Sequence, residues 1–135
     1  MKKVIRSNSD WKTELSDASY KITREKNTEA PFSGKYNLNK GHGFYKCICC
    51  NNTLFDSQKK FDSGTGWPSF YDTFSNESII ETEDNSCGMK RIEVTCKMCD
   101  AHLGHVFDDG PYPTFKRYCI NSLSLKFFKK SNNVK

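Results

Sequence analysis

The seven cysteines of the chain fall into groups whose spacing suits different chemistry. Four of them form two Cys-x-x-Cys pairs, Cys47 with Cys50 and Cys96 with Cys99. Two such pairs supply four thiolates, which complete a closed tetrahedral site for one structural Zn²⁺ ion. Cys119 stands apart, and a lone thiol near histidines and an arginine is a candidate nucleophile. The sequence therefore predicts a zinc-stapled domain with one reactive thiol.

The distance between the two pairs sets this site apart from a simple zinc ribbon. Forty-five residues separate Cys50 from Cys96, whereas a ribbon has about 15–20. We therefore expect the metal to join two distant β segments. A redox dithiol is disfavoured because no βαβ pattern surrounds either pair, but an iron–sulfur centre also uses four cysteines and stays open. Cys49 lies inside the first pair, where the spacing favours Cys50 as the ligand.

The stretch 117–121 has the pattern of a strand that presents a reactive face. Residues two apart on a strand point the same way, so Arg117, Cys119 and Asn121 share one face. A cationic arginine beside a thiol lowers its pKa. Upstream, His102 and His105 offer two imidazoles that can transfer a proton near neutral pH. Taken alone, each histidine is equally compatible with a structural role.

The elements that must position these residues are mainly short β-strands. Ser9 or Asp10 could begin a short N-terminal helix, and Ser16 a second one. Between Phe44 and Phe128, alternating apolar and polar residues separated by turns predict antiparallel strands at 43–47, 54–56, 60–62, 79–82, 90–96, 102–107, 117–121 and 123–128. A glycine-rich turn at 64–68 displays Trp67. The expected fold is mainly β, with antiparallel sheets in a single zinc-stapled domain and short N-terminal helices.

Length and composition limit the class of protein. The 135 residues predict one domain over 1–135, with flexible tails at 1–8 and 129–135. An odd number of cysteines excludes a fully paired disulfide framework. Neither a secretory signal nor an apolar stretch of about 20 residues, the length that spans a bilayer, is visible. We therefore expect a cytoplasmic protein without membrane contact. Much of the net charge of +5 lies at the two ends, which indicates solvated tails more than a nucleic-acid surface.

Four blocks of sequence together resemble one known family. They are 45–50 with the first cysteine pair, 64–70 with the sequence Gly-Thr-Gly-Trp-Pro-Ser-Phe, 96–107 with the second pair followed by His-Leu-Gly-His-Val-Phe, and 117–121 with Arg-Tyr-Cys-Ile-Asn. In this order they resemble the B-type peptide-methionine sulfoxide reductases, over about residues 11–128. The resemblance implies a β fold and reduction of the R epimer of methionine sulfoxide, since this class has one enzyme per epimer.

The resemblance also implies roles for individual residues. Cys119 would attack the sulfoxide sulfur and become a sulfenic acid, while His102, His105 and Asn121 would position water and donate hydrogen bonds to the sulfoxide oxygen. Trp67 would pack against the methyl group on the sulfur. The implied partners are oxidised proteins and thioredoxin or another thiol reductant, and we expect a monomer.

The sequence departs from the family at two positions. Many members have a cysteine in the glycine-rich turn that resolves the sulfenic acid as a disulfide, but here that position is Thr65. Cys87, Cys49 or an external thiol could take its place, and Cys87 is favoured. Phe115 stands where the family often has a glycine, at the rim of the expected pocket.

Two other functions compete with the reductase. A non-enzymatic zinc module for nucleic acid or protein partners would explain the two cysteine pairs and the basic balance. It would not explain Cys119 with Arg117 and Asn121, or the paired histidines. A metal-dependent hydrolase needs an open zinc position with bound water, and four thiolates leave none.

Overall fold

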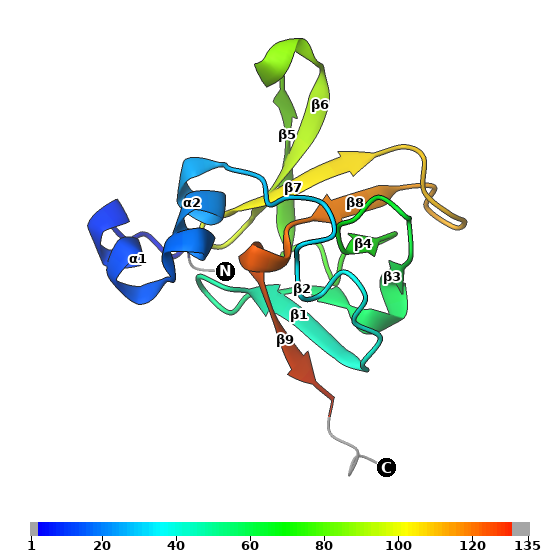
Figure 1. Cartoon of the computed structure of the whole chain (residues 1–135), viewed down its shortest axis with the longest axis horizontal. Helices are drawn as coiled ribbons and strands as arrows, with labels where there is room; N and C mark the ends of the chain where they lie inside the picture. Colours follow the sequence, from blue (N-terminus) through cyan, green and yellow to red (C-terminus); the bar gives the residue numbers. More distant parts are fainter. Residues whose placement is uncertain (1–2, 131–135) are drawn as a thin grey trace.

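Two antiparallel sheets carry the middle and C-terminal parts of the chain (Figure 1). The computed structural model describes residues 3–130, except for the side chain of Cys87. The smaller sheet has the order β2 (Thr53–Asp56), β1 (Gly43–Cys47), β9 (Leu125–Lys129). The larger has the order β3 (Lys60–Phe61), β4 (Ser69–Phe70), β8 (Arg117–Ile120), β7 (His102–Phe107), β6 (Arg91–Cys96), β5 (Ile79–Asp84). The predicted mainly β, antiparallel fold is confirmed.

Two short helices precede the sheets and pack at one side of the molecule (Figure 1). They are α1 (Asn8–Glu14) and α2 (Asp17–Glu25). Ser16 caps α2 as predicted, because its hydroxyl accepts a hydrogen bond from the Ser19 N–H at 3.1 Å. The prediction for α1 was wrong: Ser7 caps it, accepting from the Asp10 N–H at 3.1 Å. Ser, Asn and Asp all favour the N-cap, so local sequence did not decide among these neighbouring residues.

Aromatic side chains join the two sheets into one core. Tyr45 and Phe55 come from the smaller sheet, and Phe70 and Tyr118 from the larger. Phe55 stacks on Phe70 with ring centroids 4.2 Å apart, and Tyr45 meets Phe70 edge-on at 5.1 Å. Such pairs contribute about 0.5–1.5 kcal/mol each beyond the burial of their area. This contact fixes β4, and with it the preceding glycine-rich turn, against the body of the fold.

The N-terminal arm is held against the second cysteine pair. The Val4 N–H donates to the Met98 carbonyl at 2.7 Å, and Lys3 pairs with Asp100 at 2.6 Å. Trp11 is buried between two guanidinium groups, of Arg6 at 4.8 Å and Arg24 at 4.9 Å from its ring centroid. Residues 3 and 4 therefore already contact the body of the fold, although they lie within the tail predicted for residues 1–8. Residues 1–2 and 131–135 lie outside the described part of the chain.

Strands β5 and β6 form a hairpin that projects from the body of the molecule (Figure 1). Its last rung pairs Asp84 with Arg91, and a short 3-10 helix, η2 (Ser86–Gly88), closes its tip. This tip contains Cys87, whose side chain lies outside the described structure. Across residues 3–130, the helices are too short and too polar to cross a membrane.

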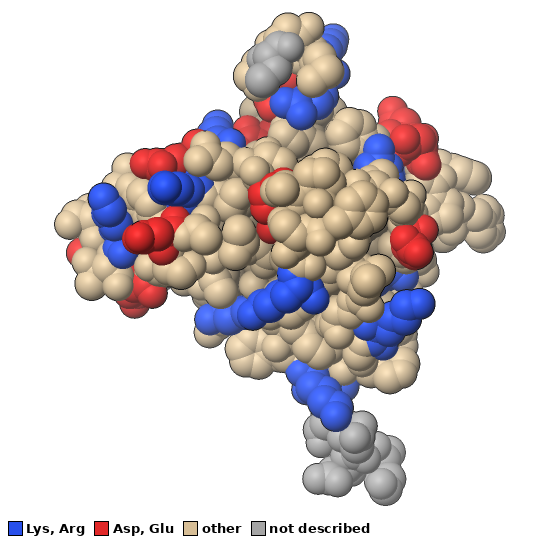
Figure 2. All heavy atoms as spheres, viewed as in Figure 1, with Lys and Arg blue, Asp and Glu red and all other residues tan. Residues whose placement is uncertain are grey.

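Charge is distributed unevenly over the visible surface (Figure 2). Over α1 and α2, acidic and basic side chains alternate, whereas basic side chains predominate beside β9. Lys46 and Lys126 sit directly opposite each other on β1 and β9. The basic excess thus reaches onto the smaller sheet.

Candidate active site and metal centre

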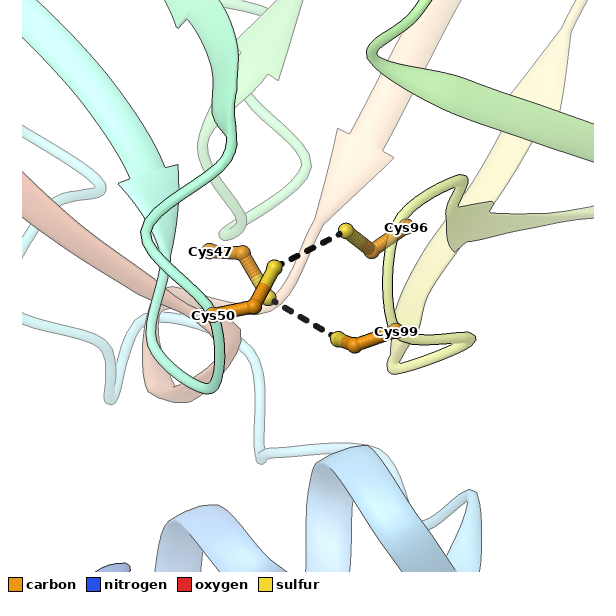
Figure 3. Close-up of side chains that lie close together, drawn as sticks. All are labelled: Cys47, Cys50, Cys96 and Cys99. Atoms are coloured by element: carbon orange, nitrogen blue, oxygen red, sulfur yellow. Dashed lines mark hydrogen bonds between the residues drawn. The ribbon is translucent and has the colours of Figure 1, made fainter. Parts of the chain in front are cut away.

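The two predicted cysteine pairs meet in one cluster (Figure 3). The four sulfur atoms lie within 4.8 Å of one another, with Cys47 to Cys99 at 3.6 Å and Cys50 to Cys96 at 3.5 Å. Four sulfurs about 2.3 Å from one zinc ion would be about 3.8 Å apart. The donor set and its dimensions therefore fit a closed tetrahedral metal site. The prediction that these four cysteines form one group is confirmed.

Both cysteine pairs use the same local backbone geometry. The first cysteine of each pair ends a strand, β1 or β6, and the residue after each second cysteine has a left-handed conformation. These residues are Asn51, with φ of 69°, and Asp100, with φ of 65°. Their N–H groups donate to the carbonyls of Cys47 and Cys96, at 3.0 and 2.8 Å. Asn and Asp tolerate this conformation best among the residues with a side chain, so the local sequence shapes both turns.

The cluster joins the two sheets, because β1 and β6 belong to different ones. N–H groups surround its sulfurs: the Asn52 amide lies 3.7 Å from the Cys96 sulfur and the Arg24 guanidinium 3.8 Å from the Cys99 sulfur. Hydrogen bonds of this kind favour thiolates over thiols. Cys49, which precedes Cys50 in the chain, is half-buried and is not one of the four.

A second site is a cavity of about 150 Å³ on the larger sheet. It is lined by Thr28, Trp67, Arg91, Gly104, His105, Phe107, Cys119 and Asn121. Cys119 on β8 lies directly opposite His105 on β7 and Ser69 on β4. A larger hollow of about 310 Å³, between residues 37–42 and 57–62, is lined by none of the site residues predicted from the sequence. The smaller cavity is therefore the candidate active site.

The strand β8 presents Cys119 as its alternation predicts. Tyr118 and Ile120 point into the core, while Arg117 and Cys119 are half-buried on the other face. Burial raises the pKa of the Cys119 thiol above its ordinary value, and the charge of Arg117 with hydrogen bonding from Thr65 and Arg117 offsets only part of that rise. Arg117 therefore acts on this pKa in the expected direction, but burial is the larger effect.

Arg117 makes its direct ion pair with a carboxylate. Its Nε and Nη2 donate to the two oxygens of Asp109 at 2.9 and 3.1 Å, and this hydrogen bonding lowers the Asp109 pKa. The guanidinium also lies 4.4 Å from the Phe107 ring centroid. Arg117 does not line the cavity itself but contacts Phe107, which does.

Each predicted histidine is held by a carboxylate. His105 Nε2 lies 2.8 Å from Asp84 Oδ2, and His102 Nδ1 lies 2.8 Å from Glu93 Oε2. The two rings meet edge-on with centroids 5.6 Å apart. His102 is buried, which lowers its pKa despite the opposing effect of Glu93, and its Nε2 has no partner among the described residues. His102 therefore does not line the cavity itself but packs against His105, which does.

The backbone of Glu29 orients two further residues. The Trp67 indole N–H donates to the Glu29 carbonyl at 3.0 Å, and the Glu29 N–H donates to Asn121 Oδ1 at 3.0 Å. The Glu29 side chain accepts from the Leu123 N–H at 3.0 Å and so holds this segment in place. Asn121 Nδ2 donates to the Leu103 carbonyl at 3.0 Å. One of the two N–H bonds of the Asn121 amide is thereby used.

A glycine allows β7 and β8 to approach closely at the nucleophile. A Cβ atom added to Gly104 would lie 1.9 Å from the Cys119 carbonyl oxygen. No side chain fits at that distance without moving one strand.

At the far end of the loop that connects β7 to β8, Phe115 has a φ of 61°. This conformation favours glycine. The Phe115 ring meets that of Tyr112 edge-on, with centroids 6.0 Å apart.

Of the six side chains predicted for catalysis or substrate binding, four line one cavity and two lie behind it. Lining it are Trp67, His105, Cys119 and Asn121, whereas His102 and Arg117 support it. Sequence reasoning missed Asp84, Glu93 and Glu29. The local sequence carried no signal for any of them. Glu93 alternates with Ile92 and Val94, a pattern that predicts an exposed carboxylate, whereas the structure buries it.

Comparison with known proteins gives a consistent result. A protein-family model described as the SelR domain matches residues 15–129. The protein named peptide methionine sulfoxide reductase MsrB from Pseudomonas putida (strain GB-1) is 56% identical over 125 residues, covering 93% of this chain and 95% of its own. Proteins of the same name from Methanosarcina mazei and Hahella chejuensis are 53% and 50% identical, over 98% and 100% of this chain and 95% and 97% of their own.

Proposed function

The chain belongs to the SelR-domain family of MsrB proteins, and on that basis we propose that it reduces methionine-R-sulfoxide in proteins to methionine. It is an oxidoreductase of the peptide-methionine (R)-S-oxide reductase class. The observation that carries the assignment is the cavity in which Cys119 meets His105, Trp67 and Asn121. The non-enzymatic zinc module is not favoured, because it gives these four residues no reason to meet.

Cys119 is the residue that changes oxidation state. Its sulfur attacks the sulfoxide sulfur, the oxygen gains a proton, and the hydroxyl passes to Cys119 as methionine leaves. The products are a sulfenic acid on Cys119 and a thioether, so the methionine sulfur gains the two electrons that Cys119 loses. Two external thiols, or one dithiol, then return Cys119 to the thiol and release water and a disulfide.

Two other side chains that line the cavity, Asn121 and His105, would bind the sulfoxide oxygen. The second N–H of the Asn121 amide is available to donate to it, since the first is used by Leu103. His105 carries the proton that the oxygen gains, and His102 supports the His105 ring edge-on. Arg117 contributes a positive charge that favours the thiolate of Cys119.

Trp67 gives the cavity an apolar wall. Its ring is oriented by the hydrogen bond from its indole N–H to the Glu29 carbonyl. A methyl group packed on this ring and an oxygen directed to Asn121 and His105 define two of the three substituents on the sulfoxide sulfur. The third is the side chain of the methionine residue, so only one epimer can satisfy all three positions.

The ion that suits the four-cysteine cluster is Zn²⁺. Cys47, Cys50, Cys96 and Cys99 would hold it with no open position, so it would stabilise the fold and leave the reaction to the cavity. We place the protein in the cytoplasm, where reducing conditions keep cysteines available as metal ligands and nucleophiles.

The reductant is thioredoxin or another thiol, acting on a monomer. Because Thr65 replaces the usual resolving cysteine, the sulfenic acid needs another thiol. Cys87, at the hairpin tip, is the internal candidate, and direct reduction by an external thiol is the alternative. Cys49 is the least suited, since it lies within the turn between Cys47 and Cys50, which the metal site would restrain.

Separate R and S epimers of a methionine sulfoxide peptide test the function directly. Wild type and Cys119→Ser are incubated with each epimer and dithiothreitol, and methionine formation is measured. We expect reduction of the R epimer alone, by wild type alone. If a folded, metal-loaded wild type reduces neither epimer, the family fold is present without the activity.

A further inference from the structure

His105 shares the cavity with the nucleophile and hydrogen-bonds with a carboxylate from a different part of the sheet. Its backbone is directly opposite Cys119 across β7 and β8, where side chains on the same face are about 5 Å apart at Cβ. Its ring lines the same cavity as Cys119. Its Nε2 lies 2.8 Å from Asp84 Oδ2 at the end of the β5–β6 hairpin.

The carboxylate of Asp84 is itself held in place. The Ser86 N–H donates to its Oδ1 at 2.9 Å, and Arg91 Nη2 lies 3.6 Å from its Oδ2. Hydrogen bonding from His105 and Ser86 keeps the Asp84 pKa well below its usual range, so the group is ionised near neutral pH. An ionised carboxylate only accepts hydrogen bonds, so His105 must carry its proton on Nε2. In the neutral ring, Nδ1 is then the basic nitrogen.

We propose that Asp84 is a positioning residue that completes a constellation of nucleophile, proton carrier and orienting carboxylate, formed by Cys119, His105 and Asp84. This extends the proposed reductase function and rests on it. The arrangement follows the general logic in which a base beside a nucleophile is oriented by a third group. Arg91 lines the cavity and pairs with Asp84 on the same rung, so the hairpin supplies both the carboxylate and its counter-charge.

The constellation accounts for the path of one proton. Nδ1 of His105 takes the proton from the Cys119 thiol as the sulfur attacks the sulfoxide. The imidazolium is stabilised by Asp84 and returns this proton to the sulfoxide oxygen as the S–O bond breaks. The thiol of Cys119 and the sulfoxide become a sulfenic acid on Cys119 and a free thioether, and His105 returns to its starting protonation state. A buried thiol with a raised pKa needs such a base.

The tautomer of His105 can be measured without any turnover. The chain has three histidines, so long-range ¹H–¹⁵N spectra of the histidine-labelled protein resolve each ring. Wild type is expected to show His105 with its proton on Nε2. In Asp84→Asn the amide can present an N–H to Nε2, which would move the proton to Nδ1. A wild-type His105 protonated on Nδ1 would overturn the proposal.

Single-turnover kinetics with the R epimer then test the consequence. Asp84→Asn should lower the saturating rate by about 10²-fold with little change in the half-saturating concentration, as loss of acid–base catalysis does. Asp84→Glu, which keeps the carboxylate, should recover part of the lost saturating rate. Glu83→Gln is the matched control, because Glu83 is the neighbouring exposed carboxylate, paired only with Lys90 at 3.1 Å among the described residues.

Two kinds of failure can be separated. If wild type reduces the R epimer and folded Asp84→Asn reduces it equally fast, the positioning role is wrong and the proposed function stands. If wild type reduces neither epimer, the proposed function is wrong and the positioning role falls with it. Retained metal content and circular dichroism establish that each variant is folded.

Discussion

Thr65 lies near Cys119, and hydrogen bonding from its side chain acts to lower the pKa of that thiol, against the larger effect of burial. Thr65 is held there by Ser63, whose hydroxyl is 2.8 Å from that of Thr65 and 2.7 Å from that of Ser69. Ser69 is buried and directly opposite Cys119 in the sheet. Thr65 stands where the family resemblance leads us to expect a resolving cysteine. It therefore lies near the nucleophile with a hydroxyl group, which cannot form a disulfide.

This proximity predicts that Thr65→Cys creates an intramolecular resolving pair. A disulfide forms only between residues whose Cα atoms come within about 7 Å, so the variant tests how closely residues 65 and 119 approach. After one turnover without added thiol, mass spectrometry should find a 65–119 disulfide, and thioredoxin-linked turnover should increase. Thr65→Val, which has nearly the same shape and no hydroxyl or thiol, is the control. A persistent sulfenic acid in Thr65→Cys would show that residues 65 and 119 do not approach closely enough to form a disulfide.

Replacement of Cys87 tests the internal resolving route in the natural sequence. If Cys87 resolves the sulfenic acid, Cys87→Ser should abolish thioredoxin-linked turnover but leave one turnover of the R epimer intact. Burst and steady-state rates separate the two. Full thioredoxin-linked activity in Cys87→Ser would remove this residue from the mechanism and leave direct reduction by an external thiol.

Removal of the metal is expected to unfold the protein, because the four-cysteine cluster joins strands of two different sheets. Thermal melting before and after chelation measures this effect. Cys96→Ser should lose the metal, whereas Cys49→Ser should keep one ion per chain, measured by elemental analysis. An unchanged melting temperature after complete chelation would contradict the structural role.

The raised pKa of Cys119 predicts slow alkylation at neutral pH. Iodoacetamide reacts with the thiolate, so its rate at Cys119 should increase as pH rises through the folded pKa, above about 9, the ordinary thiol value. Arg117→Gln should shift this increase to higher pH, because one opposing charge is lost. Site-resolved mass spectrometry separates Cys119 from the other thiols. Rapid alkylation at pH 7 would show that burial is not the dominant effect.

The same pKa shift has a consequence for stability. A thiol whose folded pKa is raised contributes stability that is fully present below its unfolded pKa and is lost as pH rises through its folded pKa. Wild type should therefore lose stability above about pH 9 more steeply than Cys119→Ser. Denaturation by urea at pH 7 and pH 10 provides this comparison.

Gly104→Ala should be strongly destabilising, by about 3 kcal/mol or more, because overpacking forces the backbone to shift. Its methyl group would meet the Cys119 carbonyl oxygen 1.9 Å away. Gly64→Ala is the useful comparison. Gly64 has a φ of 74° but nothing within 4 Å of an added Cβ, so its cost is limited to backbone strain of about 1 kcal/mol. Equal urea midpoints for the two variants would mean that β7 and β8 separate easily.

Part of this molecule is decided by short stretches of sequence. The turns of both cysteine pairs follow from cysteine spacing and from Asn51 and Asp100, which adopt the left-handed conformation readily. The alternation of residues 117–120 places Cys119 on one face of the strand and Tyr118 and Ile120 on the other, core-facing side, because successive side chains of a strand point to opposite faces. Both features depend on neighbours within a few residues. The grouping of the four cysteines and the alternation of the strand were predicted, whereas the roles of Asn51 and Asp100 emerged only from the structure.

Only the tertiary structure decided which side chains hold the predicted ones. The contacts Asp84 to His105, Glu93 to His102 and Glu29 to Trp67 join residues 9 to 38 positions apart. Such partners depend on strand register and loop packing, which are set by the summed burial of many side chains rather than by any one motif. The same physics governs Cys119, whose pKa depends on how deeply the fold buries it and not on the adjacent arginine alone.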